Sequence, residues 1–242
     1  MMQSNTLLSI VIPVYNEGEN IKPLALAIKK VVKHDLKILI VYDFDEDNTI
    51  PAVNEIKNTV PEIKLVKNKY GRGALNAIKT GLEYANTKYA LVTMADMSDD
   101  PETINKMLDI AEKNNSAIVC GSRYMKGGAQ IGGPFIKGLM SKTACLIMHY
   151  FAGVPTNDAT NSFKLYRKEF LNTVKIESNG GFELGLELVV KAYSMGLNIS
   201  EVPTTWHDRT NGQSRFKIIA WLPSYFKWFL KSFSVGFKRI FK

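Results

Sequence analysis

The chain has 242 residues, of which 45% are hydrophobic and 22% charged, and this composition excludes an intrinsically disordered protein. Its two cysteines, Cys120 and Cys145, are too few for a disulfide framework or a cysteine-rich zinc site, and they indicate a reducing compartment. The net charge of +8 lies in residues 209–242, which hold eight Lys or Arg and no acid, while residues 1–208 carry 23 of each sign. Such a basic segment suits nucleic acid or an anionic membrane.

Apolar runs alternate with helical patterns over the first 120 residues. Their positions predict strands at residues 7–14, 36–42, 63–67, 89–95 and 117–121. Helices are predicted between them, at residues 21–32, 50–59, 73–85 and 101–113. The first residues lack the features of a signal peptide, so we expect them to lead into the first strand. The alternation indicates an α/β fold with a mostly parallel central sheet and helices on both faces.

The second half is less regular. A glycine-rich loop is predicted at residues 126–133, followed by an apolar helix at 138–151 that is too short to span a bilayer. A strand at 162–166, a helix at 182–195 and a strand at 199–203 come next. We expect one domain over residues 1–217 and a helical tail over residues 218–242.

Three polar clusters follow the predicted strands, where parallel sheets bind ligands. The first is Pro13–Glu17, whose ring, amide and carboxylate suit a base and a ribose, although Asn16 could simply cap the next helix. The second, residues 43–47, holds four acids that suit a cation, a base edge or ribose hydroxyls, or else a solvated capping loop.

The third cluster contains Asp96, Asp99 and Asp100 and follows the fourth predicted strand. Carboxylates there can hold a divalent ion that bridges a diphosphate, while one of Asp99 and Asp100 caps the following helix. Three such clusters at successive strand ends favour a nucleotide site more than any one of them does.

Basic residues form the fourth group. Arg123 follows the fifth predicted strand, and Arg209 and Arg215 flank a glycine-containing segment much later. Guanidinium groups match phosphate oxygens, so these residues are candidates for anion binding. The alternative is solvated surface charge.

Together these stretches resemble the family 2 glycosyltransferases, and within them the polyprenyl-phosphate sugar synthases such as dolichyl-phosphate mannose synthase. The resemblance covers residues 7–217 in order. It rests on eight stretches: VIPVYNE, YDFDEDNT, GRGALNAIKTG, MADMSDDPE, GSRYMKGG, DATNSFKLYRK, EVPTTW and RTNGQSRFK. It implies a nucleotide-diphospho-sugar transferase fold of the GT-A kind.

The resemblance also implies roles for individual residues. The nucleotide pocket would be lined by Pro13, Tyr15, Glu17, Val41 and Asp43. The diphosphate and a divalent cation, Mg²⁺ or Mn²⁺, would lie near Ala95, Asp96 and Ser98. The residues expected to contact phosphates are Arg123, Arg209 and Arg215.

The sequence departs from the family pattern in the acidic motifs. Met94 stands where the family has the first Asp of Asp-x-Asp, so Asp96 is the expected metal ligand. Asp99 or Asp100 could supply a further ligand, or the donor phosphates could bind most of the metal. Tyr42 replaces the first acid of the second motif, Asp45 occupies a serine position, and Arg215 occupies a position that is usually lysine.

The implied reaction is an inverting transfer of a sugar from a nucleoside-diphosphate sugar to a lipid-linked acceptor. If that acceptor is a polyprenyl phosphate, it is already ionised and needs no general base. Transfer to a sugar hydroxyl of a lipid-linked or surface glycan would need one, for which Asp158 is a candidate. A catalytically dead nucleotide-sugar-binding module is a third hypothesis, motivated by Met94.

The tail has an amphipathic pattern, and Pro223 predicts the start of its helix. One polar stripe contains Ser224, Lys227, Lys231, Ser234, Lys238 and Lys242. The remaining arc is aromatic and apolar, which favours a helix lying on an anionic membrane surface. The alternative is that this arc packs on the enzyme's own body. We therefore expect a peripheral enzyme at the cytoplasmic, inner face of a membrane, and no nucleic-acid partner because the strand-end loops are acidic.

Overall fold

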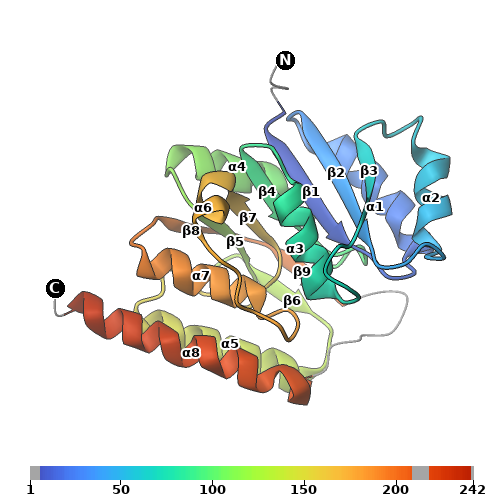
Figure 1. Cartoon of the computed structure of the whole chain (residues 1–242). Helices are drawn as coiled ribbons and strands as arrows, with labels where there is room; N and C mark the ends of the chain where they lie inside the picture. Colours follow the sequence, from blue (N-terminus) through green and yellow to red (C-terminus); the bar gives the residue numbers. More distant parts are fainter. Residues whose placement is uncertain (1–5, 209–217, 241–242) are drawn as a thin grey trace.

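The computed structural model describes residues 6–208 and the helix at residues 218–240. Its centre is a seven-stranded sheet with the order β3-β2-β1-β4-β7-β5-β8 (Figure 1). The strands are β1 (Leu8–Pro13), β2 (Leu36–Tyr42), β3 (Ile63–Lys67), β4 (Tyr89–Val92), β5 (Ile118–Ser122), β7 (Lys164–Arg167) and β8 (Ile199–Pro203). Only β7 runs antiparallel to its neighbours, β4 and β5. The predicted mostly parallel sheet is thus confirmed.

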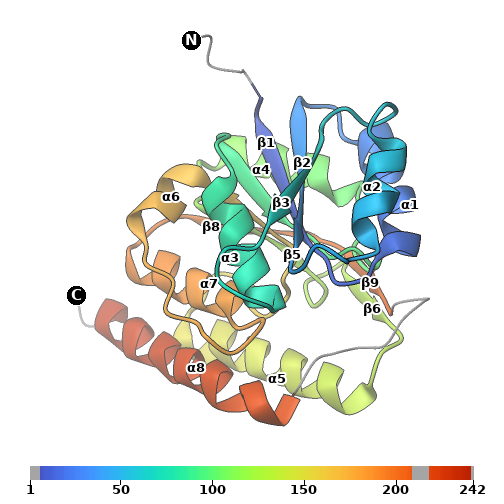
Figure 2. The same ribbon diagram turned by 45° about the vertical axis from the view of Figure 1, so that its right-hand side comes forward.

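Helices cover both faces of this sheet (Figures 1 and 2). One face carries α1 (Gly18–Val31), α2 (Thr49–Ile56) and α4 (Thr103–Lys113). The other face carries α3 (Ala74–Tyr84), α6 (Lys168–Thr173) and α7 (Leu184–Ser194), and beyond them α5 (Phe135–Ala152) and α8 (Ile218–Ile240). On each face, a separate cluster of buried apolar residues lies between the sheet and its helices.

The alternation of side chains along β1 explains these two clusters. Leu8, Ile10 and Ile12 point into the cluster beneath α1 and α4, whereas Val11 points into the cluster beneath α3. A β-carbon at Gly81 of α3 would overlap the side chain of Val11, so this glycine lets the helix approach the sheet closely. Because β1 is buried on both faces of the sheet, its sequence is a nearly continuous apolar run.

Several elements differ from the sequence-based prediction. The expected loop at 126–133 contains β6 (Ala129–Ile131), which pairs in parallel with β9 (Thr205–His207) to form a small separate sheet. Such three-residue strands carry too little periodicity to be found from sequence. The tail helix begins at Ile218 and continues through Pro223, so Pro223 does not start it. Pro223 is the sixth residue of the helix, so the helix lacks the hydrogen bond that an N–H at this position would donate to the carbonyl of Ile219.

The tail helix packs on the body of the protein. It contacts α5 and α7, and Trp228 is only 1% exposed within the core. Gly236 rests against the backbone of Ala152, where a β-carbon would clash. The opposite side of α8 exposes Phe226, Leu230 and other apolar residues. One part of the apolar arc therefore packs on the protein and the rest is exposed, while the division into two domains at residue 218 stays a prediction.

No helix in the described part of the chain is both long enough and apolar enough to cross a membrane.

Candidate active site

The residues predicted to bind the nucleotide-sugar donor lie at the carboxyl ends of neighbouring strands. The strand order reverses at β1, which lies between β2 and β4, and this is the place where open α/β sheets bind nucleotides. Pro13 is the last residue of β1, Asp43 follows β2, and Asp96 lies beyond the end of β4. The loops that the sequence singled out therefore leave three adjacent strands on the same side.

The loop after β1 is fixed to the loop after β2 by Asp47. This buried carboxylate accepts hydrogen bonds from the backbone N–H of Asn16 (3.1 Å to each oxygen) and of Thr49 (2.8 Å). Asn16 has a positive φ of 54°, and Glu17 donates its N–H to the Thr49 hydroxyl at 2.9 Å. Asp47 thus holds the loops together, which is the capping role rather than the ligand-binding one.

Asp43 is held in a different way. One carboxylate oxygen accepts from Asn68 Nδ2 at 2.8 Å and the other from the backbone N–H of Gly73 at 2.9 Å. Gly73 precedes α3 with a φ of 127°, a conformation that favours glycine. Asn68 and Gly73 were not predicted as supports of Asp43, although the Gly-Arg-Gly stretch was part of the resemblance. Asp43 is oriented as an acceptor at the carboxyl end of β2.

Two rings and a guanidinium lie beside Asp43. The rings of Tyr15 and Phe44 are 5.2 Å apart at 59°, and the Arg72 guanidinium carbon lies 5.0 Å from the centre of the Phe44 ring. Both Phe44 and Arg72 were missed from sequence as individual site residues. Flat aromatic and guanidinium groups suit the faces of a nucleobase, so this cluster fits the nucleotide-binding hypothesis.

The loop after β4 holds the predicted cation ligands. Asp96 is partly exposed and accepts a hydrogen bond from Ser98 N–H at 3.2 Å, across a turn in which Met97 has a positive φ of 57°. Asp99 is buried, and burial together with the charge of Asp96 raises its pKa to about 7. Met94 packs against the core. Within the described residues no three acidic, histidine or cysteine side chains gather as a metal site.

The small β6–β9 sheet supports this loop from outside. His207 donates its N–H to the carbonyl of Ser98 at 2.9 Å, and Asp99 pairs with Trp206 as an isolated bridge. Trp206 also packs against Gly133, just before α5. The loop with the candidate cation ligands is thereby joined to the start of α5.

Arg123 and Asp158 form a buried ion pair. Nε and Nη2 of Arg123 donate to the two carboxylate oxygens at 2.7 and 3.0 Å, and the Arg123 backbone N–H donates at 3.0 Å. The guanidinium keeps the pKa of Asp158 below its usual value against the opposing effect of burial. Because Asp158 is fully buried and its oxygens are committed, it does not suit the role of a general base.

Three hydroxyl groups surround the guanidinium. Ser141 on α5 and Thr160 each lie 3.4 Å from Arg123 Nη2, and their oxygens are 2.7 Å apart. Tyr124 donates to Ser141 at 3.0 Å, and its ring lies 4.7 Å from the guanidinium carbon. None of the three was predicted, since their partners are distant in sequence. The ion pair with Asp158 and these hydroxyl groups together fix the position of the guanidinium.

The remaining site predictions are not tested by these contacts. Arg209 and Arg215 lie outside the described residues. Val41, Ala95 and Ser98 are buried at or near the strand ends, and Glu17 accepts from Asn20 Nδ2 at 2.7 Å. The assignment of each to a nucleotide, diphosphate or metal stays a prediction.

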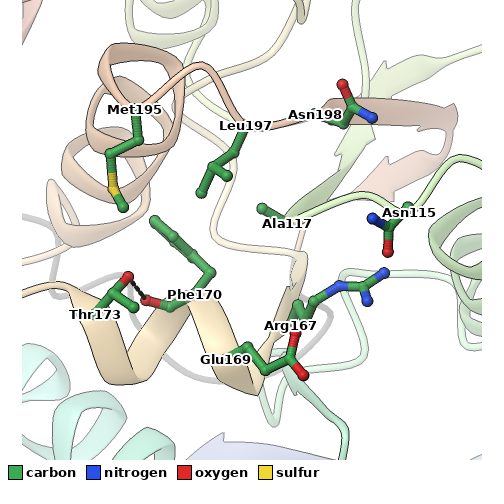
Figure 3. Close-up of a pocket in the computed structure, with 9 residues that line it drawn as sticks. All are labelled: Asn115, Ala117, Arg167, Glu169, Phe170, Thr173, Met195, Leu197 and Asn198. Atoms are coloured by element: carbon green, nitrogen blue, oxygen red, sulfur yellow. Dashed lines mark hydrogen bonds between the residues drawn. The ribbon is translucent and has the colours of Figure 1, made fainter.

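A cavity of about 240 Å³ lies at the other end of the sheet (Figure 3). It adjoins the first residues of β5 and β8, next to Ala117 and Asn198, with Phe170 and Leu197 in its wall. Arg167 at its edge is engaged by Tyr89 and by backbone carbonyls of Ser116 and Ala111. Since it opens at the amino ends of the parallel strands, it is separate from the candidate active site.

Comparison with known proteins agrees with this geometry. The sequence pattern of Glycosyl transferase family 2 matches residues 9–174. The chain belongs to this family. The resemblance recognised in the sequence is therefore confirmed at the level of the family, and the match spans the strand ends described above.

Two curated relatives extend over most of the chain. It is 32% identical over 215 residues to a dolichol-phosphate mannosyltransferase of Pyrococcus furiosus, covering 86% of this chain and 59% of that protein. It is 28% identical over 228 residues to a polyprenol monophosphomannose synthase of Mycolicibacterium smegmatis, covering 88% and 85%. The match thus spans less than two thirds of the Pyrococcus protein.

The fold is also shared with solved structures. A glucosyl-3-phosphoglycerate synthase of Mycobacterium tuberculosis, in complex with Mn²⁺, UDP-glucose and phosphoglyceric acid, matches with a TM-score of 0.67 and 13% identity. The match covers 96% of this chain and 80% of that one. At this identity the likeness confirms the GT-A-like fold.

Proposed function

We propose that this protein transfers a sugar from a nucleoside-diphosphate sugar to a polyprenyl phosphate, with inversion, at the surface of a membrane. The family and the names of the two relatives support the donor and the lipid acceptor. The observation that carries the proposal is on α5. Ser141 of this helix contacts Arg123, while its neighbour Met140 belongs to an exposed apolar face.

The exposed face of α5 continues onto α8. The two helices lie side by side and run in the same direction (Figure 1). Their exposed apolar residues are Phe135, Ile136, Leu139, Met140, Tyr150 and Phe151 on α5, and Leu222, Phe226, Leu230 and Phe237 on α8. We call this set the apolar face. Neither helix contains an acidic residue, and both carry lysines, so the face suits anionic lipid.

The acceptor chemistry follows from Arg123. A phosphate on a lipid chain is anionic, and Arg123 with its surrounding hydroxyl groups offers donors beside the helix that would rest on the lipid. Such an acceptor is already ionised, so it attacks the anomeric carbon without a general base. A reaction without a general base agrees with the ion pair that holds the Asp158 carboxylate on Arg123. The buried ion pair makes the alternative transfer to a sugar hydroxyl by Asp158 less favourable.

The donor would lie across the ends of β1, β2 and β4. Asp43 would accept from the base or ribose, with Tyr15 beside it. Asp96 would hold Mg²⁺ or Mn²⁺, and the buried Asp99 oxygen that lacks a hydrogen-bond partner supports a cation near this loop. When bound, the cation would neutralise the leaving diphosphate. The M. tuberculosis neighbour is described with Mn²⁺ and UDP-glucose, which supports a divalent cation.

A transfer assay with the full chain tests the proposal. The protein would be mixed with labelled GDP- and UDP-sugars, each with polyprenyl phosphate in vesicles or with soluble and lipid-linked glycans. We expect label in the lipid phosphate only. Label in a glycan would support the sugar-hydroxyl alternative. Donor binding with neither transfer nor hydrolysis would support the dead binding module that Met94 suggested.

The proposed location is the cytoplasmic face of a membrane, with the protein attached peripherally by the apolar face. The two unpaired, buried cysteines are compatible with a reducing compartment.

A further inference from the structure

The candidate cation site lacks an acid at the end of β4. Met94 occupies the position where the family pattern has a carboxylate, and its side chain packs against the core instead. Of the two acidic positions in the Asp-x-Asp motif, only the second, Asp96, then carries a carboxylate. A divalent cation prefers several oxygen ligands, so a single carboxylate would leave the protein's share of the site weak.

Asp99 provides an unexplained carboxylate beside this position. Its side chain is buried, with 4% of the residue exposed, and one oxygen accepts from the Thr93 hydroxyl at 3.2 Å. The other oxygen, Oδ1, is the only buried side-chain N or O atom without a hydrogen-bond partner in the described part of the chain. Buried polar atoms are almost always satisfied, so an orphan carboxylate oxygen indicates a missing partner.

The surroundings of Asp99 indicate that the missing partner is positive. Asp96 precedes Asp99 by three positions in the same loop, and the turn at Met97 and Ser98 joins the two acids. Two neighbouring carboxylates repel each other unless a cation or a proton lies between them. The backbone of Asp99 is fixed by its bridge to Trp206, so the side chain cannot simply swing out to water with the loop in place.

We propose that Asp99 is the second protein carboxylate of the divalent-cation site and takes the place of the acid that Met94 replaces. Asp96 and Asp99 bind the same ion, and the donor diphosphate and water complete its coordination. The inference rests on the proposed function for the identity of the diphosphate. It assigns a metal-binding role to Asp99, for which capping of the following helix was the simple alternative.

Cation binding itself tests this assignment. The full chain would be titrated with Mn²⁺, alone and with GDP or UDP, and free Mn²⁺ followed by electron paramagnetic resonance. We expect Asp99→Asn to weaken Mn²⁺ binding at least tenfold, and Asp96→Asn to weaken it further. Asp100→Asn is the matched control, because this neighbouring acid is exposed and accepts from Glu102 N–H. It should bind Mn²⁺ as the parent does.

A rescue variant separates ligation from a structural effect. Restoring the acid at the strand end, in the double variant Met94→Asp with Asp99→Asn, should return Mn²⁺ affinity to within about threefold of the parent. Asp99→Ala, checked by thermal unfolding, serves if the asparagine variant does not fold. Parent-like Mn²⁺ binding by a folded Asp99 variant would overturn the proposal, and so would a parent that binds no Mn²⁺. In that last case sugar transfer without metal would leave the proposed function standing.

Discussion

Arg123 and Asp158 are separated by 35 positions and yet meet through three hydrogen bonds, two from the guanidinium and one from the backbone. Arg123 follows β5, whereas Asp158 lies in the loop between α5 and β7. The pair therefore fixes the loop that follows α5 to the end of the central sheet. It also leaves the guanidinium aligned beside the hydroxyl groups of Ser141 and Thr160.

Asp158→Asn should destabilise the fold strongly. It removes the charge that compensates a nearly buried guanidinium, and breaking a buried pair costs about 3–5 kcal/mol. Chemical denaturation measures this change. Glu55→Gln is the control, since it removes an ion pair with Lys22 whose side chains are 37% and 64% exposed. A loss in Asp158→Asn no larger than that in Glu55→Gln would contradict the stabilising role.

The cost of this substitution should depend on pH. The pKa of Asp158 is lowered in the folded protein, so its contribution to stability is fully present above the unfolded value near 4. That contribution is lost as the pH falls through the folded pKa. Unfolding curves of the parent and Asp158→Asn should therefore converge below about pH 4. A constant difference between them down to pH 2 would argue against the assignment.

Asp43→Asn should weaken nucleotide binding. The amide keeps the shape of the side chain but loses the charge, and a hydrogen bond to a charged group contributes about 1.5–3 kcal/mol, or roughly ten- to a hundredfold in affinity. Isothermal titration with GDP and UDP measures it. Asp45→Asn is the control because Asp45 pairs with Lys67 at the exposed surface. Equal effects of the two substitutions would remove Asp43 from the pocket.

The two cysteines should be inert in the native protein. Cys120 and Cys145 are fully buried, and burial raises the pKa of each thiol to about 11. A thiol reagent at pH 8 should therefore react slowly with the folded chain and rapidly with both thiols in denaturant. Fast labelling of the native protein would show that the core around α5 opens readily.

Substitutions on the apolar face should release the protein from vesicles. We expect Phe135→Ser with Ile136→Ser on α5, or Phe226→Ser with Leu230→Ser on α8, to lower binding to anionic vesicles about tenfold or more. These side chains are exposed, so the fold should be kept. Sedimentation with vesicles measures the effect. Leu26→Ser on α1, also exposed but on the opposite face of the sheet, is the control and should not change it.

Point substitutions are a sharper test than removal of residues 221–242. Because Trp228, Tyr225 and Phe233 pack against the core, truncation after Ala220 would uncover it. Loss of folding on truncation would follow from that packing alone and would not report on the membrane.

The sequence was most informative where the pattern is local. The apolar run at residues 36–42 predicted β2 with its observed bounds, because a strand covered on both faces has few polar positions. Residues 63–67 predicted β3 with its observed bounds as well, although β3 is an edge strand on which Lys64 and Lys67 are exposed. The family motifs placed Asp43 and Asp96 beyond the correct strands. The predicted polar stripe of α8 also contains Lys227 and Lys231, which are exposed.

Features that depend on distant partners could not be found in this way. The pairing of β6 with β9 joins residues about 76 positions apart, and neither strand has more than three residues. Nothing local distinguished Asp47, which fixes two loops, from Asp43 in the same cluster. The packing of one side of α8 on the body depends on where α5 lies, which periodicity does not specify.

The position of β7 has a consequence for synthesis on the ribosome. β4 pairs with β1 on one side and with β7 on the other, and the register joins Tyr89 to Arg167. At about 5–20 residues per second, the outer edge of β4 stays without a partner for roughly 4–16 seconds after it has been made. An unpaired strand edge is a template for association with other chains. Nascent fragments that stop short of Lys164 should therefore aggregate or recruit chaperones more than those that extend through Pro203, which also supply β8 as the partner of β5.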